Sequence, residues 1–288
     1  MDARHILNAL LGRLWENYCA RVPSARRYRE LIEEKGGRVV NDHIAFRTFN
    51  TRLGNVPSGI IGLSRIFEPL GYRAAGSYEF TDKHLIARHY QHDDPVMPKI
   101  FISQLQVDEL PGACATLINE AVAGARDSFR DHDPGRLIDA AYDFITTLPW
   151  APPRASIVEH VNKESQYAAW TLLHGYNVNH FTAYINEQNV ADWPDIDTTV
   201  AGLIKAGVAM KDSVEGEPGS KLRQTATQAV DEDCDVRDDQ GRPSKLRWSY
   251  AYYELAERGD VEGPDGKPTR FQGFLGPQAA LLFEMTKR

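Results

Sequence analysis

The sequence predicts an α+β fold in which one order of elements, a strand, a helix and three further strands, occurs twice. Two observations predict it. The hydrophobic pattern changes from a helical period to alternation near residue 38, and the same order of elements begins again near residue 176, after a mainly helical stretch. With 288 residues, 42% of them hydrophobic, the chain is long enough for one large domain or two small ones.

The N-terminal part is predicted to contain two helices and then the first repeat of this order, called module one. Apolar residues recur at helical spacing over residues 3–21, and a second helix begins at a Ser24 cap and ends at Gly36-Gly37, so residues 1–37 form N-terminal helices. Module one covers residues 38–110. Its predicted elements are a strand at 38–49, a helix at 56–70 that Gly71 ends, and strands at 72–80, 84–92 and 99–107.

A helical insert separates module one from module two. Residues 111–175 are mainly helical, with prolines 149, 152 and 153 marking a break between two helices. Module two covers residues 176–258, and residues 259–288 are predicted to be a Gly- and Pro-rich tail with a short helix at 278–286. The predicted elements of module two are a strand at 176–185, a helix at 195–206 and strands at 208–214, 222–230 and 246–258.

Composition and charge argue against several classes of protein. Lys and Arg number 33 against 40 Asp and Glu, a net charge of −7, and no basic patch is visible, so no nucleic-acid partner is expected. Three widely spaced cysteines, Cys19, Cys114 and Cys234, indicate a reducing compartment rather than a disulfide framework. We expect a cytoplasmic protein without membrane contact, because neither a signal peptide nor an apolar run of about 18–20 residues is found. A homo-oligomer is left open.

The first strand of module one carries a histidine and an arginine on one face. Alternate residues of a strand share a face, so His43, Ala45 and Arg47 point the same way. His43 and Arg47 are then about 13 Å apart, at about 3.3 Å per residue, and a small diacid could stretch between groups on these two side chains. An exposed sheet face with a salt-bridged arginine explains the same pattern, and this segment alone favours that explanation.

Two residues of module two complete a candidate metal site. His180 lies on its first predicted strand, and Glu254 on its last, at the end of the aromatic run WSYAYY (248–253). Taken singly, His180 is better explained as a core histidine and Glu254 as a solvated carboxylate. Together with His43, which the repeat places in a corresponding strand, they match the two histidines and one carboxylate that bind Fe(II) in non-haem oxygenases.

Two other groups are weaker candidates. His84, His89 and His92 form a local cluster in which His89 faces away from the other two, and a polar sheet face or a substrate contact is favoured over a second metal site. The acidic run DEDCDVRDD (231–239) resembles the start of a calcium loop, but Val236 stands where the sharp turn needs glycine. We interpret this run as a solvated loop between strands.

Five segments resemble one known family, in order along most of the chain. They are NDHIAFRTF (41–49), GYNVNHFTAY (175–184), EPGSKLRQTAT (217–227), YYELAER (252–258) and FQGFLGPQAALLFEMTK (271–287). Together they resemble the 2-oxoadipate dioxygenase/decarboxylase family. The resemblance implies a fold similar to the vicinal oxygen chelate superfamily, in which paired βαβββ modules form a curved mixed sheet around a metal site. The repeated order of elements agrees with that fold.

The resemblance also implies the roles of particular residues. His43, His180 and Glu254 would be the Fe(II) ligands and catalytic centre and would contact the substrate, Arg47 would bind a substrate carboxylate, and Gln224 and Thr225 belong to a shared block that could face the pocket. The implied reaction converts a 2-oxo diacid such as 2-oxoadipate, with O2, into 2-hydroxyglutarate and CO2, a step that the family resemblance connects with lysine degradation. We interpret residues 1–288 as a single catalytic domain, because the site uses both modules.

Two alternatives remain. A metal-dependent lyase or isomerase of glyoxalase type could use a similar fold and metal set without O2, and a metal-free binding module could keep the fold alone. Oxygen uptake and metal analysis distinguish the three.

Overall fold

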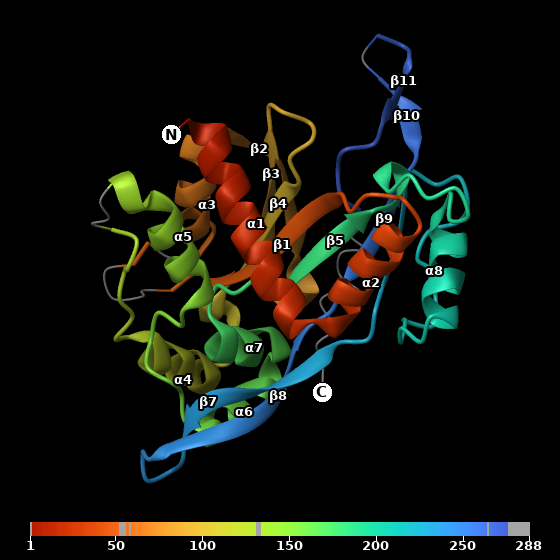
Figure 1. Cartoon of the computed structure of the whole chain (residues 1–288). Coiled ribbons are helices and arrows are strands. Elements are labelled where there is room, and N and C mark those ends of the chain that lie inside the picture. Colours follow the sequence, from red (N-terminus) through yellow and green to blue (C-terminus); the bar gives the residue numbers. More distant parts are fainter. Residues whose placement is uncertain (1, 52–55, 58, 131–133, 264, 276–288) are drawn as a thin grey trace.

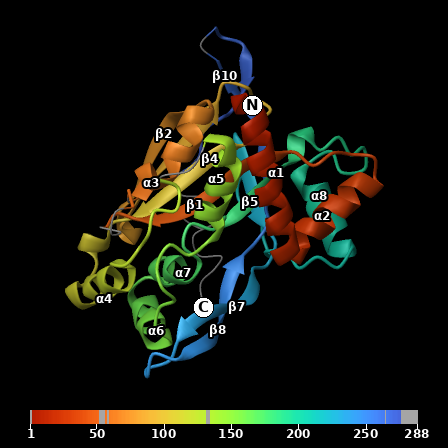
Figure 2. The same ribbon diagram turned by 60° about the vertical axis from the view of Figure 1, so that its left-hand side comes forward.

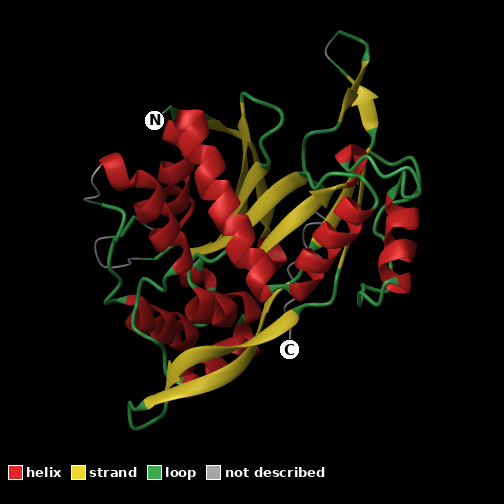
Figure 3. Ribbon diagram, in the orientation of Figure 1, coloured by secondary structure: helices red, strands yellow, loops and turns green. Residues whose placement is uncertain are grey.

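A mixed, curled sheet of seven strands forms the centre of the molecule (Figures 1 and 3). The computed structural model describes residues 2–51, 56–57, 59–130, 134–263 and 265–275. The strand order is β2-β3-β4-β1-β5-β9-β6. Helix α1 (Ala3–Arg21) crosses one face of β1 and β5, where the rings of Trp15 and Phe181 are 5.0 Å apart between centroids. This helix-covered face holds the apolar core, and the opposite face is left for the site.

Module one has the predicted order of elements. Its strand β1 (Asn41–Phe49) pairs in parallel with β4 (Lys99–Leu105), which leads through β3 (Leu85–His92) to the edge strand β2 (Tyr72–Phe80). The predicted helix is shorter than expected among the described residues: α3 spans Gly59–Phe67 and continues as the 3-10 turn η1 (Glu68–Leu70). Gly71 ends it at φ 101°, a left-handed conformation that glycine adopts without steric cost.

Further helices pack around the sheet, and among them α7 (Gln166–His174) lies against β1. Besides α1 and α7, the structure contains α2 (Pro23–Glu34), α4 (Gly112–Val122), α5 (Leu137–Thr146) and α6 (Ala155–Glu164). The prolines at 149, 152 and 153 separate α5 from α6, as predicted. The expected Ser24 cap is wrong: α2 begins at Pro23, and the Ser24 hydroxyl instead lies 3.0 Å from that of Thr227. Short 3-10 turns occur at η2 (Thr81–Lys83), η3 (Val107–Glu109), η4 (Pro134–Arg136) and η5 (Ile185–Glu187).

Module two repeats the central pairing of module one. Strand β5 (His180–Tyr184) leads to α8 (Ile196–Lys205) and pairs in parallel with β9 (Glu254–Arg258), which pairs antiparallel with β6 (Leu222–Ala226). The parallel pair β5–β9 therefore corresponds to the parallel pair β1–β4. The first strands of the two modules, β1 and β5, lie antiparallel to each other and join both modules into one sheet.

Two of the strands predicted for module two need correction. Segment 208–214 forms no regular strand. One isolated bridge pairs Met210, inside the segment, with Thr227, and a second pairs Glu215, just after the segment, with Gln224 of β6. Their registers differ, which interrupts the ladder. The predicted strand 246–258 is two strands, β8 (Pro243–Ala251) and β9, and they belong to different sheets. Trp248 and Glu254 therefore do not share one continuous strand face.

The acidic run 231–239 is not a loop. It lies largely within strand β7 (Val230–Arg237), which pairs with β8 as a separate hairpin. The buried Cys234 and Val236 alternate with exposed aspartates, which is the pattern of a strand with one covered face. In Figures 1 and 2 this hairpin extends away from the main sheet, beside α6 and α7.

A second small hairpin, β10 (Asp260–Glu262) and β11 (Pro268–Arg270), follows β9. The predicted helix at 278–286 lies outside the described residues. None of the helices in the described part of the chain is long and apolar enough to cross a bilayer.

One ion network attaches the β7–β8 hairpin to the helices. Arg21 donates from Nη2 to Glu232 Oε1 at 2.6 Å and from Nε to Oε2 at 3.1 Å, and His174 Nδ1 lies 3.3 Å from Glu232 Oε1. His174, Glu232 and Cys234 have donor atoms close enough for a metal ion. Both oxygens of Glu232 already accept from a guanidinium, however, and His174 Nε2 is bonded to the Ser249 carbonyl at 3.1 Å. We therefore interpret this cluster as structural.

This network predicts a pH-dependent stability. Burial opposes ionisation of Glu232, but the hydrogen bonds from His174 and Arg21 hold its pKa down at about 2, below its ordinary 4.5. A lowered carboxyl pKa gives stability that is present above about pH 4.5 and is lost as the pH falls toward about 2. Glu232→Gln should lower the free energy of unfolding at pH 7 by about 1–3 kcal/mol. Urea unfolding should show this difference shrinking over that acid range, and a constant difference would contradict the assignment.

Candidate active site

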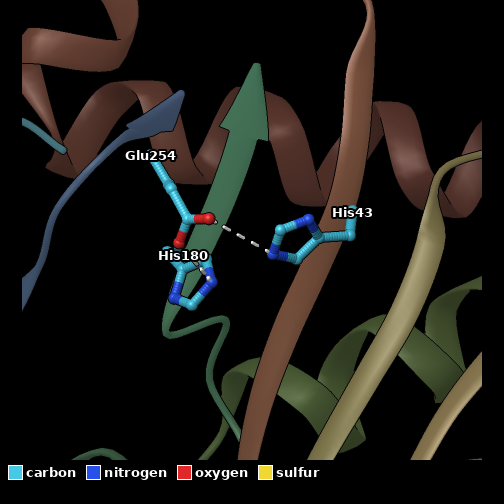
Figure 4. Close-up of side chains that lie close together, drawn as sticks. All are labelled: His43, His180 and Glu254. Atoms are coloured by element: carbon cyan, nitrogen blue, oxygen red, sulfur yellow. Dashed lines mark ion pairs between the residues drawn. The ribbon is translucent and has the colours of Figure 1, made fainter. Parts of the chain in front are cut away.

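Strand pairing brings residues of both modules into one cluster. In the antiparallel pair β1–β5, Ala45 lies opposite His180 and His43 opposite Thr182, and in the parallel pair β5–β9, Thr182 lies opposite Glu254. His43, His180 and Glu254 therefore project from three neighbouring strands, and Figure 4 shows their side chains pointing toward one another.

The three side chains converge closely enough to hold a metal ion. Glu254 Oε1 lies 3.7 Å from His43 Nε2, and Glu254 Oε2 lies 3.2 Å from His180 Nε2. One potential ligand atom from each residue lies within 4.8 Å of the others. All three are buried, with Glu254 fully enclosed at 0% exposure. The solvated glutamate considered for this position is therefore wrong.

The electrostatics of the cluster favour a bound cation. Burial lowers the pKa of His43 and lowers that of His180 further, so both rings are neutral near pH 7 and each keeps a lone pair. Burial raises the pKa of Glu254 well above its ordinary range, although Gln224 Nε2 donates to Oε1 at 2.5 Å. Glu254 Oε2 accepts no hydrogen bond from the described residues. A buried carboxylate in this state is costly unless a cation compensates it, so these residues fit a divalent metal.

A β-bulge adds a second carboxylate behind His43. The pairing of β1 with β5 shifts by one residue between Asn41 and His43, and Asp42 is the extra residue. In a regular strand the Asp42 side chain would point to the face opposite His43. Here its Oδ2 lies 2.8 Å from His43 Nδ1. A proton on Nδ1 then leaves Nε2 free to ligate, in keeping with the carboxylate–histidine–metal arrangement. Thr182 Oγ1, 3.0 Å from the same Nε2, can donate to it.

Two cations keep Asp42 ionised. Burial opposes its charge, but Arg258 and Lys99 hold the pKa of Asp42 well below its ordinary range. Arg258 donates from both Nε and Nη2 to the two oxygens, at 2.5 and 2.7 Å, and Lys99 Nζ is 3.6 Å from Oδ1. The bidentate pair fixes the carboxylate plane, and with it the hydrogen bond to His43.

Asp42→Asn should weaken metal binding at His43. The neutral amide accepts more weakly from Nδ1–H, so we expect a loss of about 10- to 100-fold in metal affinity, which is usual for an outer-shell carboxylate. Competition with a chelator measures the affinity, and nitrogen NMR of the imidazole reports the tautomer. The matched control is Asp235→Asn, an exposed aspartate on β7. Unchanged affinity and tautomer in Asp42→Asn would remove Asp42 from this role.

A small cavity of about 30 Å³ opens beside the cluster. It is lined from both modules, by residues that include Ala45, Arg47, Phe101, Asn179 and Gln224. Arg47 is 1% exposed, and its guanidinium carbon lies 5.0 Å from the ring centroids of both Tyr167 and Trp170. The exposed sheet face considered for this segment is therefore wrong, because His43, Ala45 and Arg47 are buried and line this cavity. A buried guanidinium within it can bind an anion.

Of the two residues predicted from the KLRQTAT block, only Gln224 lines the cavity. Gln224 and Thr225 are neighbours on β6 and lie opposite Ala256 and Leu255, so their side chains point to opposite faces. Gln224 bonds to Glu254, whereas the Thr225 hydroxyl donates to the Ser213 carbonyl at 2.9 Å.

The histidine cluster of module one is divided. His84 contacts Glu109 at the surface, and His92 bonds to the Leu70 carbonyl. His89 lies opposite Phe101, which itself lies opposite Ala45, so it joins the outer wall of the site. Alternation along β3 correctly places His89 on the face opposite His92. It does not reveal which of the two faces belongs to the site.

Several site residues were missed from sequence. Asn179 Oδ1 lies 3.1 Å from His180 Nδ1 and can orient that ring as Asp42 orients His43. Phe101 and Ser103 reach the cavity because the parallel β1–β4 register places them opposite Ala45 and Arg47. An asparagine directly before the histidine was a usable signal. Phe101 and Ser103 carried no such signal in the sequence, because their place in the site follows from the pairing of β4 with β1.

Comparisons of the sequence with known proteins agree on one family. A sequence model described as 2-oxoadipate dioxygenase/decarboxylase matches residues 11–277. A curated relative, "2-oxoadipate dioxygenase/decarboxylase, chloroplastic" from Arabidopsis thaliana, is 28% identical over 196 residues, 64% of this chain and 50% of the relative. The chain spans about half the length of the curated relatives it matches.

Solved structures agree with the fold. The hydroxyglutarate synthase of Oryza sativa, crystallised with 2-oxoadipate, is 26% identical, with a TM-score of 0.82 over 99% of this chain and 93% of that one. A structure from Ralstonia eutropha JMP134 that carries the name of the glyoxalase superfamily is 24% identical, with a TM-score of 0.80 over 95% and 87%. The second likeness shows the fold alone. Together they confirm the predicted α+β class.

Proposed function

This chain belongs to the 2-oxoadipate dioxygenase/decarboxylase family, and from this premise we propose that it is a non-haem Fe(II) enzyme acting on a 2-oxo diacid with O2. The observation that carries the proposal is the convergence of His43, His180 and Glu254 beside a cavity that also contains the buried Arg47. Two neutral imidazoles and one carboxylate suit Fe(II) and leave positions open for substrate and O2.

The proposed reaction needs no external reductant. With 2-oxoadipate as substrate, the bond between C1 and C2 breaks and the original carboxylate leaves as CO2. One atom of O2 completes a new carboxylate at the former keto carbon, and the other becomes the hydroxyl on the adjacent carbon. The products, 2-hydroxyglutarate and CO2, then balance the substrate and O2 in atoms and electrons.

The protein residues divide into two groups in this reaction. His43, His180 and Glu254 would hold the metal on one side, and Arg47 would bind the distal carboxylate of the diacid. Bound Fe(II) would supply the activation of O2 that side chains alone cannot provide. Because Arg47 and His43 lie on the same face of β1 with Ala45 between them, a chain held at both ends passes over a small methyl group.

A local cation explains how an acidic protein binds a dianion. The net charge of −7 is spread over the chain, whereas the charge nearest the cavity is that of Arg47, which is 1% exposed. Electrostatic attraction is stronger there than in bulk solvent. The site draws on strands of both modules, so we also propose that they act as one catalytic domain.

An anaerobic reconstitution experiment tests the function. Protein loaded with Fe(II) under argon is mixed with a panel of 2-oxo acids, and O2 is then admitted. We expect 2-oxoadipate-like diacids to give O2 uptake, CO2 and a 2-hydroxy diacid in equal amounts. Turnover without O2 by the Zn(II) or Ni(II) form would instead identify a glyoxalase-type lyase or isomerase. Absence of any bound metal after reconstitution would indicate a binding module.

A further inference from the structure

A short segment after the β10–β11 hairpin closes one side of the cavity. We name residues 271–275 the strap. Its Phe274 lines the cavity and is 8% exposed, and its ring centroid lies 4.8 Å from that of His43 and 4.9 Å from that of Phe101. Its edge-on geometry against His43, 87° between planes, places the phenyl ring directly beside the metal cluster.

The strap is held mainly by side chains. Arg258 Nη1 donates to the carbonyls of Phe271 and Gly273, at 3.1 and 2.8 Å, and the Phe274 N–H donates to the Tyr78 hydroxyl at 3.2 Å. One backbone bond, from Phe271 N to the Gly259 carbonyl, anchors its beginning. Displacing the strap therefore costs a few hydrogen bonds and the ring contacts of Phe274, and it breaks no strand of the central sheet.

The cavity is too small for the proposed substrate with the strap in this position. Its volume of about 30 Å³ is two to three times the roughly 10–15 Å³ that a single water molecule needs. A 2-oxo diacid is several times larger, so part of the wall must move. The other lining side chains belong to strands of the sheet, or, for Asn179 and Tyr252, to positions just before β5 and β9. Phe274 is the lining residue carried outside the sheet.

Arg258 connects the strap to the metal cluster. The same guanidinium that donates to the strap carbonyls donates to both oxygens of Asp42, which bonds to His43. The strap is therefore positioned from the same rigid group that orients a metal ligand.

We propose that Phe274 is a specificity-determining residue: the strap yields when the 2-oxo acid enters, and the phenyl ring sets the longest chain that the cavity accepts. This inference rests on the proposed function, because it assumes a 2-oxo acid bound at the metal. The ring packs against methylene groups, so its size, and not a charge, selects the substrate. Removing it should open space for additional methylene groups.

Chain-length profiles of Phe274 variants test this inference. For the Fe(II)-loaded protein, kcat/KM is measured for 2-oxo diacids with four to eight carbons, and binding of the same acids is measured under argon. In Phe274→Ala we expect the ratio of kcat/KM for longer acids to that for the six-carbon acid to rise about tenfold for each added methylene group, the usual value for a hydrophobic pocket. Phe274→Trp should shift the profile the opposite way, toward shorter acids.

Phe271→Ala is the matched control, since Phe271 lies in the same strap but contacts Lys221 outside the cavity. Its chain-length profile should match that of the wild type. An unchanged profile in both Phe274 variants would overturn the inference, and Phe274→Trp keeps the test decisive if the alanine variant does not fold. A wild-type protein that neither binds nor converts any 2-oxo diacid would instead refute the proposed function.

Discussion

Replacing His180 by alanine should abolish turnover and prevent the reconstituted protein from retaining iron. The variant leaves one imidazole and one carboxylate, and Glu254 loses the ring that lies 3.2 Å from its Oε2. The loss of metal affinity should exceed the roughly 10- to 100-fold that removal of an outer-shell partner costs. Iron content after anaerobic reconstitution and dialysis, with O2 uptake on a 2-oxo diacid, measures both effects.

A matched variant separates this effect from general damage. His160 is exposed on α6, away from the described cavity, so His160→Ala should keep full iron content and activity. Circular dichroism checks that His180→Ala still folds, since the His180 ring stacks on Tyr252 at 4.9 Å between centroids. Full iron content and activity in folded His180→Ala would eliminate the proposed metal site.

Arg47→Lys should raise KM for a diacid far more than for a 2-oxo acid with a neutral tail. A guanidinium offers two parallel donors to a carboxylate, whereas an ammonium group is a compact point charge that cannot reproduce that geometry. A hydrogen bond to a charged group is worth about 1.5–3 kcal/mol, which corresponds to roughly 10- to 100-fold in affinity. The neutral-tailed acid does not use this contact and should change little.

The comparison of two substrates makes this test internally controlled. Any rearrangement of the Tyr167 and Trp170 rings around residue 47 would affect both acids, whereas loss of carboxylate recognition affects only the diacid. Arg38→Lys, on an exposed arginine outside this cavity, should leave both KM values unchanged. Equal increases for both acids in Arg47→Lys would remove Arg47 from substrate recognition.

The order of elements in module one and the shared placement of His43, Arg47 and His180 could be predicted because their signals are periodic. Alternation along β1 places His43 and Arg47 on one face, and the repeated order of elements relates His180 to His43. The β7–β8 hairpin could not be predicted in this way. A strand that continues the central sheet and one that leaves it share the same alternation, and the break at Tyr252-Tyr253 has no glycine or proline to mark it.

The positions of Asp42 and Phe274 lay beyond sequence analysis for different reasons. Alternation assigns Asp42 to the face opposite His43, and only the one-residue shift in pairing with β5 brings its carboxylate to the histidine ring. Phe274 follows a stretch rich in glycine and proline with no periodic pattern. Its place depends on contacts of the strap with Arg258 and with Tyr78, and Tyr78 is 196 positions away in the chain.

The antiparallel pairing of β1 with β5 has a consequence for the order of assembly. The bonded residues His43 and Thr182 are 139 positions apart, and closing so long a loop costs entropy before any contact compensates it. Contacts of this separation are typical of slow folding steps. His43 belongs to module one, whereas His180 and Glu254 belong to module two, so neither half of the newly made chain contains the whole cluster. If the cluster binds the proposed Fe(II), we expect the metal to enter last, into a chain whose two halves have already docked.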